Sequence, residues 1–310
     1  MTERRLNKYL YAILTVVLII GIVEAAMMLS DVISLGMSEG LMLAIKRVIP
    51  TAFPFMIISD LFLAYARPEY IPVLPRVFRA IYSLPERCLG AALIGSVCGF
   101  PIGAKIASDM YVGGLVTKED AEVTIAYSSA PSPAFVIGVV GGGMLGDITR
   151  GVMLLFAIHL GTAIVAQFRR RKVSNITISD ISSRQRFSFV ESVKSAGMAS
   201  ISIAAFISVF ALIKNLVVLL IPFEPLKAVI ISLLEVTGAC EFFAGISGFS
   251  DAVRMALIGF SLGFGGVSVA CQTAAFSARC GLSIMPYLLI KLLSGIATSF
   301  IAVILTLLVI

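Results

Sequence analysis

The residues that could do chemistry gather at two interruptions in long apolar stretches. One is Gly-Phe-Pro-Ile-Gly-Ala-Lys at 99–105, and the other is Ser-Ser-Ala-Pro-Ser-Pro at 128–133. Proline donates no backbone hydrogen bond and glycine loosens a helix, so both segments interrupt helices. The residues that break the backbone here are Gly99, Pro101, Gly103, Pro131 and Pro133. In hydrocarbon, such breaks survive only where they are buried in protein or line a wet cavity, as in the midplane sites of many transporters.

Polar side chains at these breaks are candidates for binding a solute. Lys105 follows the first break, and Asp109 lies one helical turn later, so the two side chains can pair on one helix face. An ionisable residue at membrane depth is a functional candidate, whereas at the interface both groups would simply meet water. Ser128, Ser129 and Ser132 can donate to a polar solute or coordinate a cation, but they can equally cap carbonyls freed by the break.

The second half of the chain carries a similar interruption. Gly265 and Gly266 are followed by Ser268 and Gln272, so this segment offers a broken backbone with polar side chains beside it. Because it mirrors the break at 99–105, we expect Ser268 and Gln272 to contribute to the same solute site.

Glu235 and Thr237 form another polar interruption. A buried Glu235 would be costly unless it is paired, hydrogen-bonded or protonated, so these two residues are candidates for ion coupling or for supporting the site. Three more charged residues, Glu24, Lys214 and Lys291, lie in or near apolar runs. Snorkelling of side chains from helix ends accounts for them about as well as a functional role.

The composition places the chain in the membrane. Of 310 residues, 59% are hydrophobic and 14% are charged, and the mean hydropathy is +1.03. The net charge is +6, and the positive residues cluster next to hydrophobic segments, where they set the orientation of the protein in the membrane and contact anionic lipid. This charge is therefore no sign of nucleic-acid binding. Segments apolar enough to span the bilayer are expected at about 9–29, 41–66, 88–112, 121–142, 147–168, 190–220, 226–247, 251–275 and 283–308.

Few residues could support catalysis or metal binding. The five cysteines show no paired spacing and fit small buried hydrophobes: Cys88, Cys98, Cys240, Cys271 and Cys280. His159 is the only histidine and has no nucleophile beside it in the sequence. We therefore expect neither an enzyme nor a metal or other cofactor.

The basic connectors predict the orientation. The N-terminus and the connectors 67–87 and 169–189 are rich in Arg and Lys, so all three should face the cytoplasm. Five apolar segments separate the N-terminus from Arg169, and an odd number of crossings cannot return the chain to the same side. We therefore expect 88–112 to be a re-entrant hairpin that turns at its GFPIG centre, since a break there can be buried in protein.

A short internal repeat predicts two related halves. Leu93-Ile94-Gly95 and Gly99-Phe100 match Leu257-Ile258-Gly259 and Gly263-Phe264 with the same spacing, although a chance match in so apolar a chain remains an alternative. The expected fold is therefore an all-α polytopic membrane protein with two related, inverted halves and broken or re-entrant helices. Its expected divisions are 1–30 (first transmembrane helix), 31–168 (first repeat), 169–189 (basic connector) and 190–310 (second repeat).

The strings SVCGFPIGAKIASDMYVGGLVTKEDAE and YSSAPSPAFVIGVVGGGML resemble the corresponding region of the YlbJ-type sporulation integral membrane proteins. The later strings LLEVTGACEFF and GFGGVSVACQ look like matching elements of that family, so the resemblance covers roughly residues 45–295. It implies the nucleoside-recognition, or Gate, domain group, which includes the concentrative nucleoside transporters. It also implies a bacterial inner-membrane protein with inverted repeats and helical hairpins, but not nucleoside as the solute.

Two functions of different classes follow. One is a permease that moves a small polar solute by alternating access, with the lipid bilayer and the solute as its partners. The other is a non-transporting membrane component of a spore or envelope assembly complex, with sporulation partners or further copies of itself. An intramembrane enzyme ranks behind both because the sequence offers no acid–base or nucleophile set.

Overall fold

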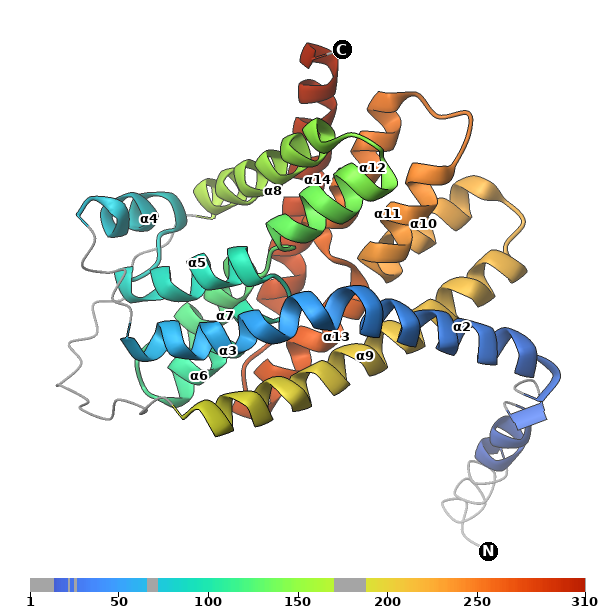
Figure 1. Ribbon diagram of the computed structural model, residues 1–310, viewed down its shortest axis with the longest axis horizontal. Helices are drawn as coiled ribbons and strands as arrows, with labels where there is room; N and C mark the ends of the chain where they lie inside the picture. The colour runs from blue at the N-terminus through green and yellow to red at the C-terminus, as the bar shows by residue number, and fades with distance from the viewer. Residues whose placement is uncertain (1–13, 22, 25–26, 66–71, 170–187, 310) are drawn as a thin grey trace, which may run out of the picture.

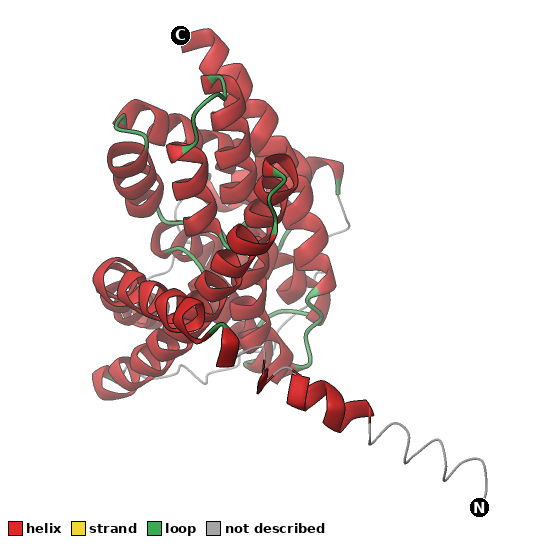
Figure 2. Ribbon diagram, turned by 90° about the vertical axis from the view of Figure 1, so that its right-hand side faces the viewer, coloured by secondary structure: helices red, strands yellow, loops and turns green. Residues whose placement is uncertain are grey.

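The computed structural model of the chain describes residues 14–21, 23–24, 27–65, 72–169 and 188–309, and these contain helices and no strands (Figure 2). The predicted all-α class is therefore confirmed. Of the expected helix at 9–29, residues 14–21, 23–24 and 27–28 are described and helical, whereas 9–13, 22 and 25–26 lie outside the described residues, as does nearly all of the connector 169–189.

Helices of the first half follow the predicted apolar segments, with interruptions at 99–101 and 129–133, and one further helix lies in the connector 67–87. They are α2 (Ser30–Leu43), the π-helical turn η1 (Ala44–Val48), α3 (Ile49–Tyr65), α4 (Leu74–Tyr82), the 3-10 turn η3 (Glu86–Cys88), α5 (Leu89–Cys98), α6 (Ile102–Val112), α7 (Lys118–Ser128), the π-helical η4 (Ala134–Met144) and α8 (Ile148–Phe168).

The second half of the chain follows the connector (Figure 1). Its helices are α9 (Phe189–Leu220), α10 (Glu224–Leu234), α11 (Val236–Gly245), α12 (Asp251–Phe264), α13 (Gly266–Ser277), the 3-10 turn η5 (Ala278–Cys280) and α14 (Met285–Val309).

Each half contains a long helical segment, two helix pairs joined at a break, and a final long helix. By element order, α5–α6 corresponds to α10–α11, α7–η4 to α12–α13, and α8 to α14. Corresponding helices of the two halves also pack together, since α2 lies on α9 and α8 lies on α14. The Leu-Ile-Gly motif instead pairs α5–α6 with α12–α13, so the register that it suggests differs from the element order.

Glycines let α2 and α9 approach closely. A Cβ added to Gly36 would lie 2.7 Å from the Cα of Leu212, and one added to Gly40 would fall on the Cα of Ser208. The contact positions rise in α2 as they fall in α9, so the two helices are antiparallel. Small residues at such a seam are typical of helix pairs in membranes, where close van der Waals packing drives association.

One end of the bundle, here called the connector face, gathers α4, the end of α8 and the loops 113–117 and 281–284. Gln167 of α8 donates to the carbonyl of Ala80 at 3.2 Å and also to that of Ile81 in α4. Arg87 donates to the carbonyl of Leu115 at 2.9 Å. The backbone of Ser283 donates to Glu122 near the start of α7 at 2.8 Å. The described parts of the two basic connectors therefore meet on one face of the protein.

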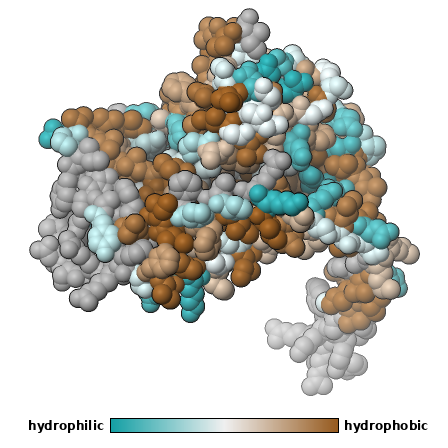
Figure 3. Space-filling view, viewed as in Figure 1, coloured by the Kyte–Doolittle hydropathy of each residue, from teal (hydrophilic) through white to brown (hydrophobic). Residues whose placement is uncertain are grey.

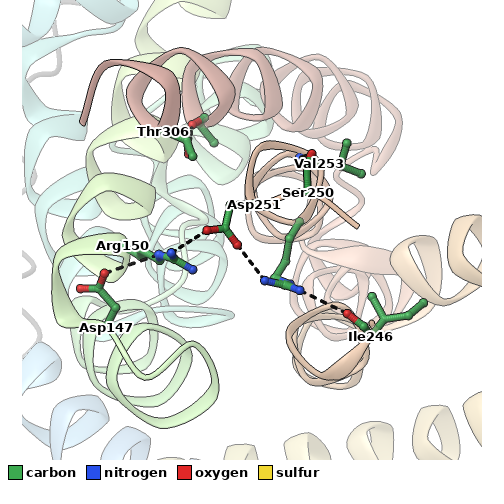
Figure 4. A network of polar contacts seen from close by, with 9 residues as sticks. Asp147, Arg150, Ile246, Ser250, Asp251, Val253 and Thr306 are labelled. Carbon is green, nitrogen blue, oxygen red and sulfur yellow. Dashed lines mark hydrogen bonds and ion pairs between the residues drawn. The ribbon is translucent and has the colours of Figure 1, made fainter. Parts of the chain in front are cut away.

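An ionic clasp, Arg150–Asp251–Arg254, marks the other end of the bundle, here called the clasp face (Figure 4). Asp251 lies 2.8 Å from Arg150 of α8 and 2.8 Å from Arg254 of its own helix. Arg254 also donates to the carbonyl of Ile246 at the end of α11, at 3.2 Å. The clasp thus ties the start of α8 to the start of α12 and to the end of α11.

The two faces stand about one membrane thickness apart. Helix α8 joins them with 21 residues, which at 1.5 Å per residue is about 31 Å. Among the described residues, four helical segments are long and apolar enough to cross a membrane: Ile148–Phe168, Phe189–Leu220, Asp251–Cys280 and Met285–Val309. Large apolar side chains stay exposed along α9 and α14, and hydrophobic residues cover much of the coloured face in Figure 3.

Candidate functional site

Four helix breaks lie at similar depth between the two faces. They are the first break (99–101), the second break (129–133), the third break (Glu235) and the fourth break (Gly265). The helices flanking them have 10 to 14 residues, or about 15–21 Å each, so each break lies about half a bilayer from the nearer face.

The first break is the tip of a hairpin. A Cβ added to Gly95 of α5 would lie 3.0 Å from the Cα of Gly103 in α6, so the chain reverses between these residues. Because α5 follows Arg87 and α6 leads into Leu115, both arms of this hairpin reach the connector face. The predicted reversal at GFPIG is therefore confirmed, and Gly95 lets the two arms approach closely because a side chain there would press on the backbone of Gly103.

The second break crosses the tip of this hairpin. Cβ atoms added to Gly95 or Gly103 would fall on the carbonyl oxygen of Ser128, and one added to Gly99 would lie 3.0 Å from the backbone nitrogen of Ser132. Gly99 also has φ +86°, a conformation that side chains disfavour. Glycines at and beside the first break thus leave room for the backbone of the second break.

The fourth break joins the halves. A Cβ on Gly265 would lie 3.3 Å from the ring of Phe100, and one on Gly266 would lie 2.9 Å from the carbonyl oxygen of Leu234 and 3.1 Å from the nitrogen of Glu235. The two breaks that the sequence singled out therefore meet, with the third break beside them. We call this meeting place of the four breaks the junction.

A second hairpin approaches the junction from the clasp face. Helices α10 and α11 pack together on either side of Glu235 (Figure 1). The carbonyl of Ile246, which follows α11, belongs to the clasp. The end of this hairpin that lies away from Glu235 is therefore at the clasp face, whereas the corresponding end of the α5–α6 hairpin is at the connector face.

Lys291 is the buried cation of the junction. Its side chain lies in α14 and is 1% exposed. Its Nζ donates to the carbonyl of Ser129 at 2.7 Å and lies 5.6 Å from the ring centroid of Phe100. Snorkelling is therefore the wrong interpretation of Lys291. The available signal was its position as the seventh residue of a helix that carries no other charged residue.

Glu235 caps a buried helix end. Its carboxylate accepts from the backbone nitrogens of Thr237 at 3.0 Å and Gly238 at 2.6 Å, and the residue is 7% exposed. An anion at a helix N-terminus satisfies unpaired N–H groups and complements the helix dipole. Lys214 of α9 lies on the other side of Gly238 from this carboxylate. A Cβ added to Gly238 would be 3.4 Å from Oε2 of Glu235 and 3.7 Å from Nζ of Lys214, so a cation approaches the carboxylate from α9.

Lys105 forms the i,i+4 ion pair expected from its spacing. Its Nζ lies 3.3 Å from Asp109, and the two side chains are 20% and 52% exposed. The pair sits on the arm of the hairpin rather than at its tip, so Lys105 is a neutralised and less buried cation than Lys291.

The serine hydroxyls bond to their own helices. Ser129 donates to the carbonyl of Ile125 at 2.6 Å, Ser128 to the same carbonyl at 3.4 Å, and the hydroxyl of Ser132 accepts from the nitrogen of Phe135 at 3.3 Å. In this conformation the three serines therefore cap the break, which is one of the two roles that the sequence left open for them.

The remaining candidates lie near the third and fourth breaks. Gln272 donates to Ser268 at 3.4 Å along one face of α13, and both side chains are buried. Thr237 is buried in the first turn of α11. Within the described part of the chain, no group of three or more His, Cys, Asp or Glu side chains could hold a metal ion.

Comparison with known proteins gives one distant relative. Over 127 residues, the chain is 27% identical to the sporulation integral membrane protein YlbJ of Bacillus subtilis (strain 168). The match covers 41% of this chain and 31% of that protein. No family model and no solved structure matches the chain. The chain is thus distantly similar to a sporulation membrane protein, as its motifs suggested.

Proposed function

We propose that this chain is a permease-like protein of the nucleoside-recognition (Gate) group, which binds a small polar solute at the junction and moves it by alternating access. We place it in the bacterial inner membrane with its basic connectors in the cytoplasm and a role in sporulation. The proposal assigns it no enzymatic reaction. It rests on one observation above all: hairpins that open at opposite faces meet halfway between them.

An inverted pair of halves would explain this arrangement. If α5–α6 and α10–α11 are equivalent hairpins, the two faces of the protein are built alike, and rocking one half against the other would open the junction to each face in turn. Packing of α2 on α9 and of α8 on α14 supports such a relation, because a two-fold axis brings equivalent helices together.

Within this proposal the junction supplies the solute contacts. Ser128, Ser129 and Ser132 line the second break, while Ser268 and Gln272 follow the fourth. Broken-helix carbonyls and hydroxyls would replace the water shell of the solute. Glu235 and Thr237 of the third break would bind a coupling ion or support the site. Lys105 and Asp109 would act on the hairpin arm that leads to it.

The alternative is a non-transporting component of a sporulation assembly. The name of the Bacillus relative favours it, as does the bonding of the three serines within their own helices. A packed junction that binds no solute would serve such a role equally well.

Thermal denaturation of the purified full chain in the presence of solutes separates the two functions. Nucleosides, amino acids, dicarboxylates and metal ions form the panel, and a bound solute raises the melting temperature. The Ser129→Ala variant should weaken the response. Ser208→Ala is the matched control, because its hydroxyl makes the same type of bond, to Ala204 at 2.8 Å, on the seam with α2.

The permease proposal requires a solute whose stabilisation is reduced in Ser129→Ala and kept in Ser208→Ala. Folded protein that no member of the panel stabilises would contradict it and favour the assembly role.

A further inference from the structure

Lys291 has far fewer partners than its chemistry demands. An ammonium group has three N–H donors, and in the described part of the chain this one meets a single acceptor, the carbonyl of Ser129 at 2.7 Å. Its other polar contact is the face of Phe100. No described carboxylate lies within ion-pair distance of its Nζ, although Lys105, Lys227, Arg150 and Arg254 all have one.

Such a cation is expensive to bury. Removing an ammonium group from water is costly even after the protein relaxes around it. One cation–π contact and one carbonyl hydrogen bond offset only part of that cost. The balance is met either by loss of the proton or by an anion that enters the junction.

Two buried hydroxyls beside Lys291 favour the anion. Tyr287 precedes it by four residues and Ser294 follows it by three, so all three side chains share one face of α14. Both residues are at most 1% exposed. The Ser294 hydroxyl has no hydrogen-bond partner in the described structure, and the Tyr287 hydroxyl faces the hydroxyl of Thr273 in α13. Hydroxyl donors and an ammonium group on one stripe suit oxygen atoms that carry negative charge.

One more hydroxyl without a partner lies on a helix that packs against this stripe. Thr124 of α7 is buried, and its hydroxyl makes no hydrogen bond to other described residues. Helix α7 packs against α14. A neutral lysine would need none of these donors, whereas an anion would use them.

We infer that Lys291 binds an anionic group of the solute, a carboxylate or a phosphate, with the hydroxyls of Tyr287 and Ser294 as further donors. The inference rests on the proposed function and names its substrate class. It assigns the positive charge of the site to Lys291, because Asp109 neutralises Lys105 at 3.3 Å.

Anion-dependent melting of the purified full chain tests this assignment. Succinate, inorganic phosphate and uncharged uridine are titrated at constant ionic strength into the wild type, Lys291→Met and the control Lys227→Met, which removes a largely buried lysine that is paired with Glu224. We expect succinate or phosphate to raise the melting temperature of the wild type and of Lys227→Met. In Lys291→Met the half-saturating concentration should rise at least tenfold. Response to succinate alone identifies a carboxylate, and response to phosphate alone identifies a phosphate.

Two results overturn the inference. One is a wild type that neither anion stabilises. The other is a response to an anion that Lys291→Met keeps unchanged. Stabilisation by uridine alone would remove the anionic substrate class while the permease proposal stands.

Variants that keep the ammonium group cover the case in which Lys291→Met does not fold. Tyr287→Phe and Ser294→Ala each remove one hydroxyl from the stripe. Each should raise the half-saturating concentration severalfold, and unchanged anion binding in both would likewise overturn the inference.

Discussion

The ring of Phe100, at the tip of the first hairpin, lies against Gly265 in the middle of the α12–α13 segment, 3.3 Å from the place of a Cβ. Phe100 also carries the Nζ of Lys291 over its ring. One aromatic side chain therefore touches both a break of the second half and the buried cation. If one half moves against the other, Phe100 must either separate from Gly265 and Lys291 or move together with them.

Gly265→Ala should destabilise the protein by about 1–2 kcal/mol, because alanine disfavours the left-handed conformation that Gly265 holds at φ +88°. The new methyl group would also press on Phe100. Chemical unfolding in detergent micelles measures the change. Gly197→Ala is the control, since no atom lies within 4 Å of its Cβ position in α9. Equal stability of the two variants would contradict the structure at the fourth break.

Single cysteines at Lys118 and Ser247 should be labelled from opposite sides of the membrane. Both residues are exposed, Lys118 at the start of α7 near the connector face and Ser247 in the loop between α11 and the clasp. Membrane-impermeant thiol reagents, applied to intact cells in a background without the native cysteines, make the measurement. We expect Ser247→Cys to react and Lys118→Cys to stay protected until the cells are opened. Reaction of both in intact cells would refute hairpins that open at opposite faces.

Glu235→Ala should cost about 1 kcal/mol, the usual loss on removing a helix N-cap, because the nitrogens of Thr237 and Gly238 lose their acceptor. Glu241→Ala on the exposed side of the same helix serves as the control and should change the free energy of unfolding little. Equal losses in the two variants would show that the cap contributes nothing.

Asp251→Asn should weaken the clasp, since one carboxylate holds both Arg150 and Arg254 at 2.8 Å. These groups are partly exposed, so we expect a loss of about 1 kcal/mol at low salt. The loss should shrink as salt screens the charges. Glu224→Gln, which breaks a pair within α10, is the comparison. A loss that does not depend on salt would indicate packing rather than charge.

The positions of the breaks were predictable from the sequence. Gly-Phe-Pro and Ser-Ser-Ala-Pro interrupt apolar runs, and hydrocarbon tolerates few ways of arranging a backbone that lacks its hydrogen bonds. The parity of the apolar segments between two basic ends also predicted the reversal at 88–112. These properties are local or depend only on the order of segments along the chain.

Tertiary structure decided which residues form the junction. Lys105 and Asp109 pair because they are one turn apart, and this was readable from their spacing. The burial of Lys291 could not be predicted from the sequence, because its partners Ser129 and Phe100 come from elements of the other half, far away along the chain. A lysine in an apolar helix snorkels or stays buried according to which neighbours cover it, and only the packing of distant helices supplies those neighbours.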